Sequence, residues 1–336
     1  MGTKLVKTIE DIARLANVSK STVSRALNDS SLINPETKER IKAIAEEHNF
    51  CMNLPARNLS RRQSCTVGFV THSHQCGFTV EDMFGLEIMS AIGSGLDELG
   101  FDLLIIHMKP RDTSWAHQYF DSGRVDGFIM MKTGRGHAYS KLLSEMNAPF
   151  IIWGVSEPEI NGCTVTGDNL SGGIIATEHL IRIGRKKIAF LGGPENDLEA
   201  QLRQKGYETA MLSADRTIDP KLMANGDYLM DSGMTGMKQL LEKTPDLDAV
   251  FVCGDVMAIG AIEVIQNSGK RVPEDVAVVG YDDLAIATYN NLPLTTVKQN
   301  IQMSGKLLAQ NLVQSIKTGV VTHVTVPVEL VVRKSA

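Results

Sequence analysis

The feature that most constrains the fold is an alternation of short apolar runs with amphipathic stretches, which begins near Thr66 and restarts near Lys186. Continuous apolar runs of this length are typical of parallel strands that are buried on both faces of a sheet. The predicted strands are residues 67–70, 103–107, 127–131, 150–153, 188–191, 249–253 and 276–279. The predicted helices include residues 85–99, 172–183, 232–241 and 256–267. This alternation predicts a doubly wound α/β architecture.

The number of strands exceeds what one compact sheet of ordinary size holds, and the rhythm restarts halfway, so we expect two similar lobes. Ligands of open parallel sheets bind outside the carboxyl ends of the strands. Two facing lobes would therefore enclose a ligand cleft. The segments expected to line it are residues 71–78, 153–156 and 192–196, with Asp255 and residues 281–283.

The first fifty residues follow a different pattern, which predicts three short helices. Thr8 and Asp11 can cap a first helix that ends at Asn17, and Ser19 can cap a second. Asn34 followed by a proline and a glutamate predicts a third helix that runs to about His48. Two short helices joined by a tight turn indicate a helix-turn-helix, and the alternative is an ordinary helical hairpin.

The second helix has an outer face that suits DNA recognition. Its inward residues would be Val23, Ala26 and Leu27. The outer face is short, polar and basic, and it carries Lys20, Ser21, Ser24, Arg25 and Asn28. Side chains of this kind near the start of a recognition helix can reach base edges or phosphates in the major groove.

The segment 52–64 has the composition of a basic linker. A turn of helix near Pro55 would direct Arg57, Arg61 and Arg62 toward phosphate and leave Leu59 as an exposed apolar wedge. Such a wedge is typical of side chains that enter the minor groove and bend the duplex. The alternative is a flexible basic tether.

The length of the chain and the distribution of its charge both indicate that it has two different parts. A chain of 336 residues is expected to form two or three domains. Residues 1–64 contain eleven basic and seven acidic residues, a net charge of +4, whereas the whole chain has a net charge of −5. A basic head on an acidic body fits a protein whose head meets polyanionic phosphate. The sequence lacks a signal peptide and an apolar run of bilayer length, so we expect a soluble, cytoplasmic protein.

The sequence contains none of the standard catalytic signatures that we considered. Phosphate-binding loops, dinucleotide-binding glycines and a nucleophile elbow are missing. The five cysteines are scattered and form no C-x-x-C pair, which argues against a disulfide framework or a structural zinc site. His72, His74 and Cys76 could present metal ligands, but no closing ligand pair is evident.

The predicted strand ends instead offer groups suited to a polyol. Carboxylates and a guanidinium can grip vicinal hydroxyls while an aromatic face covers a sugar ring. The candidates are Asp168, Arg203, Asp255 and Asp282, with Trp153 and Tyr228. The alternative for Asp168 and Asp255 is that they only cap the helices that follow them.

These segments together resemble one family. TIEDIARLANVSKSTVSRALN, NPETKERI and NLPARNLS are similar to the headpiece and hinge of the lactose-repressor/galactose-repressor (LacI/GalR) family of bacterial transcription regulators. The effector core of the same family resembles VDGFIMM, GDNLSGG, HLIRIGRKKIAFLGGP, LRQKGYETAM, FVCGDVMAIGA, RVPEDVAVVGYDD and LPLTTVKQ. The resemblance covers nearly the whole chain.

The resemblance implies a fold and a division into domains. It implies a three-helix helix-turn-helix headpiece (1–53), a hinge (54–64) and a two-lobed core like the periplasmic sugar-binding proteins (65–336). With three crossings between the lobes, lobe 1 would comprise about 65–166 and 296–322, and lobe 2 about 167–295 and 323–336. Members of this kind act as homodimers on pseudo-palindromic operators, and the lack of leucine heptads before Ala336 argues against a tetramerising tail.

The resemblance and the residue patterns together give two sets of site residues. The predicted DNA-binding residues are Thr8, Lys20, Ser21, Thr22, Ser24, Arg25, Asn28, Arg57 and Leu59. The predicted effector-binding residues are His72, Trp153, Asp168, Arg203, Tyr228, Asp255 and Asp282. The family's usual proline after the headpiece is Met52 here, its Asn-Pro-Phe is replaced by HSHQCGF, and Trp153 replaces a common aspartate. These departures change the expected identity of the effector and leave the expected DNA binding largely intact.

The sequence therefore predicts a nucleoid-associated repressor whose operator affinity is controlled by a small effector of carbohydrate class, bound in the cleft between the two lobes. We expect no cofactor, no metal, no membrane partner and no enzyme activity. The alternatives are a cytoplasmic sugar-binding module that does not regulate DNA, and an α/β enzyme acting on a sugar.

Overall fold

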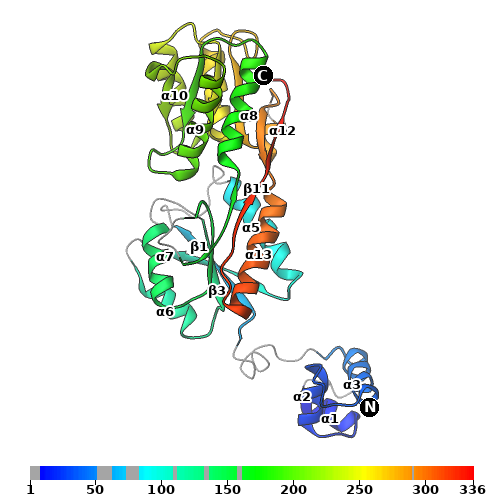
Figure 1. Cartoon of the computed structure of the whole chain (residues 1–336). Helices are drawn as coiled ribbons and strands as arrows, with labels where there is room; N and C mark the ends of the chain where they lie inside the picture. Colours follow the sequence, from blue (N-terminus) through cyan, green and yellow to red (C-terminus); the bar gives the residue numbers. More distant parts are fainter. Residues whose placement is uncertain are drawn as a thin grey trace. The chain divides into compact units, whose positions relative to one another are not determined.

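The computed structural model describes residues 8–50, 63–72, 83–108, 112–131, 136–156, 161–289 and 291–336. The chain divides into two compact units, Met1–Ser64 and Cys65–Ala336. Helices and strands carry the labels of Figure 1. In the described part of the chain, no helix is both long enough and apolar enough to span a membrane.

The first unit contains the three predicted helices, α1 (Ile9–Leu15), α2 (Lys20–Leu27) and α3 (Pro35–Glu47). Thr8, Ser19 and Asn34 are their N-caps, as predicted. Thr8 and Asp11 form a capping box, in which each side chain accepts a hydrogen bond from the other's backbone N–H at 3.2 Å. Asn17 has a left-handed φ of 51°, which ends the first helix.

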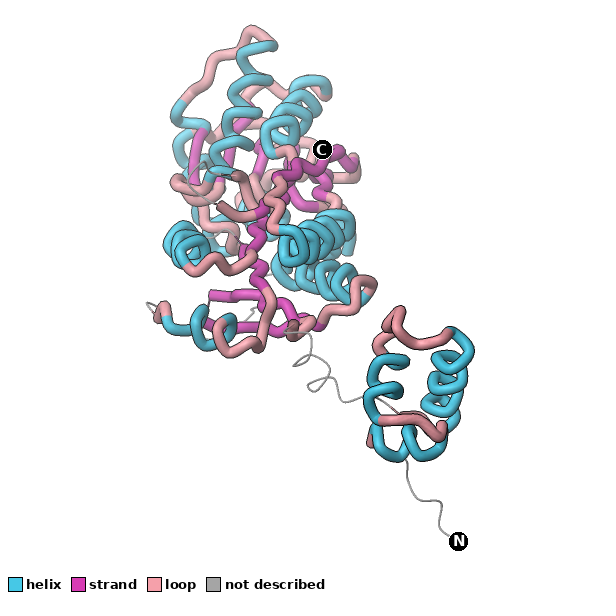
Figure 2. The backbone as a smooth tube through the Cα atoms, turned by 60° about the horizontal axis from the view of Figure 1, so that its bottom comes forward, coloured by secondary structure: helices cyan, strands magenta, loops and turns pink. Residues whose placement is uncertain are grey.

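The headpiece has a small apolar core to which all three helices contribute. Ile12 from α1, Val23 and Ala26 from α2 and Ile41 from α3 are fully buried. Figure 2 shows this unit, within its described residues, as helices joined by loops. Because α2 buries Val23 and Ala26, its opposite side is left to solvent, as the helix-turn-helix prediction requires.

The described residues of the second unit form two six-stranded sheets, one in each lobe. The first sheet has the order β11-β5-β4-β3-β1-β2, and all neighbouring strands are parallel. Its strands are β1 (Thr66–His72), β2 (Asp102–Met108), β3 (Gly127–Met131), β4 (Phe150–Trp153), β5 (Cys163–Gly167) and β11 (His323–Val326). One face packs against α5 (Met83–Asp97) and α13 (Ile301–Thr318), which lie side by side in Figure 1. The other face packs against α6 (Ser114–Phe120) and α7 (Gly136–Glu145).

The second sheet has the order β12-β10-β9-β8-β6-β7. Its strands are β6 (Ile188–Gly192), β7 (Met223–Asn225), β8 (Ala249–Val252), β9 (Ala277–Asp282), β10 (Thr295–Gln299) and β12 (Val328–Val331). Helices α8 (Asn169–Arg182) and α9 (Leu198–Ser213) cover one face, and α10 (Met230–Lys243) and α11 (Asp255–Asn267) cover the other. The edge strand β12 is antiparallel to β10, and the other neighbours are parallel. The doubly wound two-lobed prediction is confirmed.

The chain crosses between the lobes three times, but two crossings differ from the predicted boundaries. Residues 296–299 were assigned to lobe 1, whereas β10 pairs with β9 in the second sheet. Residues 323–326 were assigned to lobe 2, whereas β11 pairs with β5 in the first. Strand pairing decides membership here, so the chain leaves lobe 2 after Gln299 and returns to it at Pro327.

The predicted strands do not include five of the described ones, β5, β7, β10, β11 and β12, and three of these were missed for a common reason. β5 (CTVTG), β10 (TTVKQ) and β11 (HVTV) mix threonine with valine and lack a continuous apolar run. Their polar side chains find partners that lie far away in the sequence. For example, Thr296 Oγ1 donates to Asp255 Oδ1 at 2.6 Å. A pattern search over neighbouring residues has no access to such partners.

Candidate functional site

The outer face of α2 presents most of the predicted DNA-reading side chains. Lys20, Ser21 and Arg25 are exposed, and the other three predicted residues of the helix and its end, Thr22, Ser24 and Asn28, are half-buried. Lys20 forms an ion pair with Glu10 of α1. An exposed pair of this kind costs little to break, so Lys20 remains able to meet a phosphate.

Local hydrogen bonds fix the shape of this face. Ser19 Oγ caps α2 by accepting from Thr22 N at 3.1 Å, and it lies 2.8 Å from the hydroxyls of both Ser21 and Thr22. At the other end, Asn28 Nδ2 donates to Ser24 O at 2.8 Å. Thr8 Oγ1 accepts from Asp11 N at 3.2 Å and donates to Asp11 Oδ2 at 2.8 Å, so its observed role is that of an N-cap. The predicted hinge residues Arg57 and Leu59 lie outside the described residues.

The second lobe gathers a polar cluster where its central strands end, around a buried arginine. Arg203 of α9 is 5% exposed. Its Nε donates to Asn169 Oδ1 at 2.8 Å, its Nη1 donates to Cys253 O at 2.5 Å, and its guanidinium carbon lies 3.8 Å from the ring centroid of Tyr281. Stacking on an aromatic face and two fixed hydrogen bonds hold the guanidinium in one orientation.

Asp282, the last residue of β9, belongs to the same polar cluster as Arg203. Gln299 Nε2 donates to Asp282 Oδ1 at 2.7 Å. Burial raises the pKa of Asp282 to about 6, although the charge of Arg203 and the hydrogen bond from Gln299 act in the opposite direction. The two groups attract each other, yet no direct ion pair joins Arg203 to Asp282.

Asp255 is placed differently from its neighbours. It is fully buried, and both of its oxygens are used within the lobe: Thr296 Oγ1 donates to Oδ1, and Leu284 N donates to Oδ2 at 2.9 Å. Burial raises its pKa well above the usual value. The N-cap of α11 is Gly254, so the alternative that Asp255 caps this helix is wrong. Its bonds hold Leu284, just after Asp282 at the end of β9, and Thr296 of β10.

Asp168 and Tyr228 lie at the edge of this cluster. Asp168 is the N-cap of α8 and accepts from Ser171 N at 3.0 Å, which confirms the capping alternative and leaves ligand contact open. Tyr228 donates its hydroxyl to Asp197 Oδ1 at 2.9 Å. Burial raises the pKa of Tyr228 well above its usual value, so this hydroxyl stays neutral.

Trp153 belongs to the other lobe, at the end of β4. It is 8% exposed, and its ring centroid lies 5.6 Å from that of Phe84. Val256 and Leu284 of the second lobe share its apolar cluster. Trp153 therefore packs where the lobes meet. For His72 the structure describes the strand but not the side chain. His74 and Cys76 lie outside the described residues, and the metal site that these three residues could form therefore lies outside them too. The described residues contain no group that could hold a metal ion.

Two glutamates that the sequence prediction missed link the lobes reciprocally. Val155 N of the first lobe donates to Glu199 Oε1 of the second at 2.8 Å, and Ala285 N of the second lobe donates to Glu87 Oε1 of the first at 3.1 Å. No local pattern marks these residues, because each acts on a backbone N–H far away in the sequence. Asn169, Asp197 and Gln299 were missed because the side chains that they bind, those of Arg203, Tyr228 and Asp282, are also distant in the sequence.

We expect the double replacement Glu87→Ala and Glu199→Ala to favour separation of the lobes by about 1–3 kcal/mol, because two charge-assisted hydrogen bonds between them are lost. Small-angle scattering should show a larger radius of gyration, and the amides of Val155 and Ala285 should exchange faster. Glu242→Ala on the exposed side of α10 is the control. Unchanged scattering and exchange would show that these contacts do not hold the lobes together.

Asp282 gives a pH-dependent prediction. Its folded pKa of about 6 lies above the unfolded value of about 3.9, so its contribution to stability is complete below about pH 4 and is lost as pH rises through 6. In urea titrations, Asp282→Asn should remove this component between pH 4 and 7. Asp275→Asn is the control, because hydrogen bonds from Arg271 lower the pKa of Asp275 to about 2 and its effect falls at lower pH. Parallel profiles for wild type and Asp282→Asn would contradict the assignment.

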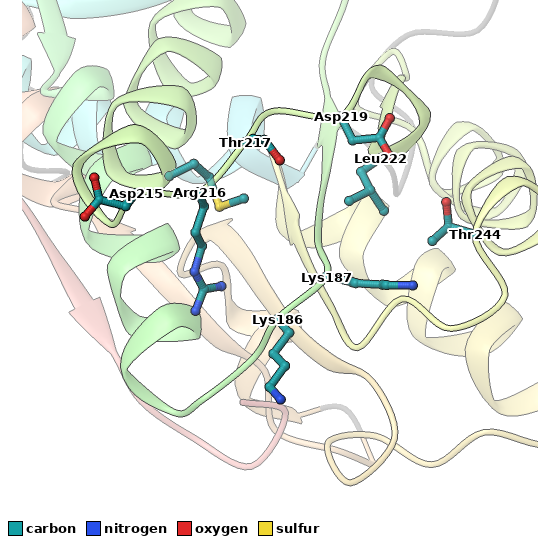
Figure 3. A pocket seen from close by; sticks show the side chains of 9 residues that line it. Lys186, Lys187, Asp215, Arg216, Thr217, Asp219, Leu222 and Thr244 are labelled. Atoms are coloured by element: carbon teal, nitrogen blue, oxygen red, sulfur yellow. The ribbon is translucent and has the colours of Figure 1, made fainter.

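A surface hollow of about 470 Å³ lies elsewhere on the second lobe (Figure 3). Its lining residues are Lys186, Lys187, Met211, Asp215, Arg216, Thr217, Asp219, Leu222 and Thr244. Two of its cations are already engaged, since Lys187 pairs with Asp246 and Arg216 Nη1 donates to Arg185 O at 2.5 Å. Lys186 and Lys187 precede β6, so this hollow is at the amino ends of the strands and contains none of the predicted effector residues.

A three-helix headpiece joined to two lobes with parallel sheets defines the architecture of a ligand-responsive DNA-binding regulator. Comparison with known proteins agrees. Residues 8–53 match the family described as bacterial regulatory proteins, lacI family, and residues 177–336 match the periplasmic binding protein-like domain. The HTH-type transcriptional regulator CelR of Thermobifida fusca is 35% identical over 330 residues, which cover 96% of this chain and 95% of that protein.

Two solved structures are similar over nearly their whole length. The complex of transcriptional regulator CelR with cellobiose has a TM-score of 0.76 and 33% identity, and the match covers 98% of this chain and 99% of that one. The lac repressor dimer bound to operator and the anti-inducer ONPF has a TM-score of 0.79 and 30% identity, with 99% of each chain covered. This chain belongs to the LacI family of bacterial regulatory proteins and is a DNA-binding transcriptional regulator.

Proposed function

We propose that this protein is a homodimeric repressor that binds a pseudo-palindromic operator and whose operator affinity is changed by a carbohydrate bound between the lobes of its core. The lac repressor dimer bound to operator supports the dimer and the DNA partner. The CelR–cellobiose complex supports a sugar as the effector class. Action on DNA in the cytoplasm, at the nucleoid, is part of the same proposal.

The observation that carries the effector assignment is a donor and an acceptor of the same polar cluster that are both left unused. Arg203 uses Nε and Nη1 within the lobe, and no described residue accepts from its Nη2. Asp282 uses Oδ1 for Gln299, and no described residue donates to its Oδ2. Vicinal hydroxyls of a sugar can accept from the first group and donate to the second, which leaves neither charge unsatisfied.

The remaining predicted effector residues take supporting places in this proposal. Tyr228 and Asp168 flank the pair, and Asp255 holds the segment that carries Asp282. Trp153 approaches from the first lobe at the end of β4, and His72 ends β1, which is separated from β4 by β3. An aromatic side chain and neutral hydroxyls suit the apolar and polar sides of a pyranose.

On the DNA side, we propose that Arg25, Lys20 and Ser21 read base edges. Thr22, Ser24, Asn28 and the N-cap Thr8 would contribute phosphate contacts and hold the helix in register. For residues 54–64 we retain the hinge prediction, in which Leu59 enters the minor groove and Arg57 contacts the backbone. The alternative of a sugar sensor that does not bind DNA is disfavoured by the match of residues 8–53 to the family's DNA-binding part.

A sugar screen by thermal shift tests the effector proposal, because a ligand of the native state raises its apparent melting temperature. A panel of monosaccharides and disaccharides should contain a sugar that raises the midpoint of wild type. The same sugar should leave Asp282→Asn unchanged, since the amide removes the charged acceptor. A shift of equal size in both proteins would place the sugar elsewhere, and no shift with any sugar would overturn the carbohydrate assignment.

A further inference from the structure

Cys65 is the first residue of the second unit, so it is the point at which the DNA-binding part of the chain is attached to the core. Its φ is 50°, a left-handed backbone conformation that a residue with a side chain rarely adopts unless its neighbours hold it. Its side chain is half-buried against the apolar cluster of lobe 1. The chain therefore turns sharply just before β1 begins at Thr66.

The backbone of Cys65 is held on both sides by residues that are distant in the sequence. Its N–H donates to Asp126 Oδ2 at 2.7 Å, and its carbonyl oxygen accepts from Asp102 N at 2.8 Å. Asp126 is half-buried, and its own N–H donates to Thr66 O at 2.8 Å. A charged acceptor forms a stronger hydrogen bond than a neutral one. The Asp126 carboxylate therefore fixes the peptide group that links Ser64 to Cys65.

The same arrangement recurs in lobe 2, where no DNA-binding unit is attached. Asp126 directly precedes β3, which pairs with β1, and Asp248 directly precedes β8, which pairs with β6. Asp248 accepts from Lys186 N and from Lys187 N, each at 2.8 Å, just ahead of β6. The segment that reaches Lys186 comes from α8 of the same lobe. Of the three residues held in this way, only Cys65 has a left-handed φ.

We propose that Asp126 is a positioning residue for operator binding, because it fixes the direction in which the chain leaves the core to join the DNA-binding unit. This inference rests on the proposed function, in which a dimer places two such units on the two half-sites of one operator. Binding of the second half-site is then intramolecular, and its effective concentration depends on how well the two attachments match the spacing of the half-sites. Freer rotation at Cys65 lets each unit sample more directions and lowers that concentration.

The test measures the affinity of the full-length protein for two duplexes by fluorescence anisotropy at one fixed salt concentration. One is the operator selected from randomised DNA. The other has two extra base pairs between its half-sites, which rotate one half-site about the duplex axis by about 70°. Wild type should bind the lengthened duplex about a hundredfold more weakly. Asp126→Ala should bind the selected operator about tenfold more weakly than wild type does, and it should lose less than about threefold on lengthening.

Two further variants separate positioning from damage to the fold. Asp126→Asn keeps an acceptor oxygen at the same place, so it should retain most of the spacing preference of wild type. Asp248→Ala removes the corresponding hydrogen bonds from lobe 2. Its melting temperature should fall about as much as that of Asp126→Ala, while its spacing preference should equal that of wild type.

The same loss on lengthening in Asp126→Ala as in wild type would overturn the inference and leave the proposed function standing. Equal relaxation of the spacing preference by Asp248→Ala would also overturn it, since the effect would then come from a general loss of stability. If wild type binds the two duplexes equally, the operator with two half-sites is wrong, and both proposals fail.

Discussion

Replacing Arg203 with methionine is expected to lower the free energy of unfolding of the core by about 3–5 kcal/mol, because removal of one member of a buried charge network leaves its partners uncompensated. The lost interactions are the hydrogen bonds to Asn169 and Cys253 O and the contact with the Tyr281 ring. The loss also removes the positive charge that opposes the raised pKa of Asp282. Urea denaturation of the full chain at pH 7, followed by tryptophan fluorescence, measures the change.

Arg271→Met is the matched control for this substitution. Arg271 forms an ion pair with Asp275 at 3.0 Å, and its side chain is 70% exposed, so the same change in chemistry should leave the free energy of unfolding nearly unchanged. Similar losses for the two variants would mean that Arg203 is not embedded in a cooperative network. A stable Arg203→Met protein that also kept its sugar affinity would contradict both roles given to this side chain.

Arg25→Ala is expected to weaken binding to the specific operator by about 1–3 kcal/mol and to reduce discrimination against a mutated half-site. Arg25 is exposed on the outer face of α2, where a guanidinium can donate two hydrogen bonds to one guanine. Fluorescence anisotropy with specific and scrambled duplexes, at one fixed salt concentration, separates affinity from specificity.

Arg14→Ala controls for loss of positive charge from the headpiece. Arg14 lies on α1, is 61% exposed and pairs with Asp11 at 2.7 Å. Both variants lose one charge, so both can weaken binding to scrambled duplex slightly. Only Arg25→Ala should reduce the ratio of specific to scrambled affinity. Equal ratios for wild type and Arg25→Ala would remove this residue from base reading.

The headpiece was predictable almost residue by residue because its signals are local. A hydroxyl or amide N-cap, an early acid and a short apolar stripe act within a few positions, so Thr8, Ser19 and Asn34 marked the helix starts correctly. The strands β6 and β8 were predictable on the same basis. A strand that is buried on both faces appears as a continuous apolar run in its own sequence.

What the sequence did not show depends on partners that are distant along the chain. The threonine-rich strands β10 and β11 are placed by pairing with β9 and β5, which no local pattern shows, and two lobe boundaries were therefore misplaced. The same holds at the site. Arg203 and Asp282 were found from the polar groups expected near the strand ends and from the family resemblance, whereas Gln299, which binds Asp282, and Glu87, which reaches across the lobes, required the tertiary structure.

The reciprocal contacts of Glu87 and Glu199 connect the proposed effector site with the arrangement of the lobes. Glu87 accepts from Ala285 N, close to Asp282, and its charge contributes to the raised pKa of that aspartate. A sugar that donates a hydrogen bond to Asp282 therefore binds beside a contact between the lobes. An effector changes a protein's conformation only by binding its states with different affinity, and this juxtaposition offers a physical source for the difference.

The most direct test of the account is the affinity of the full-length protein for its selected operator duplex, measured by anisotropy with and without a saturating concentration of the sugar identified in the thermal screen. The account predicts at least a tenfold change in the dissociation constant for wild type, and less than a twofold change for Asp282→Asn. The same operator affinity in the presence and absence of a sugar that demonstrably binds wild type would contradict the central claim that the core's ligand controls DNA binding.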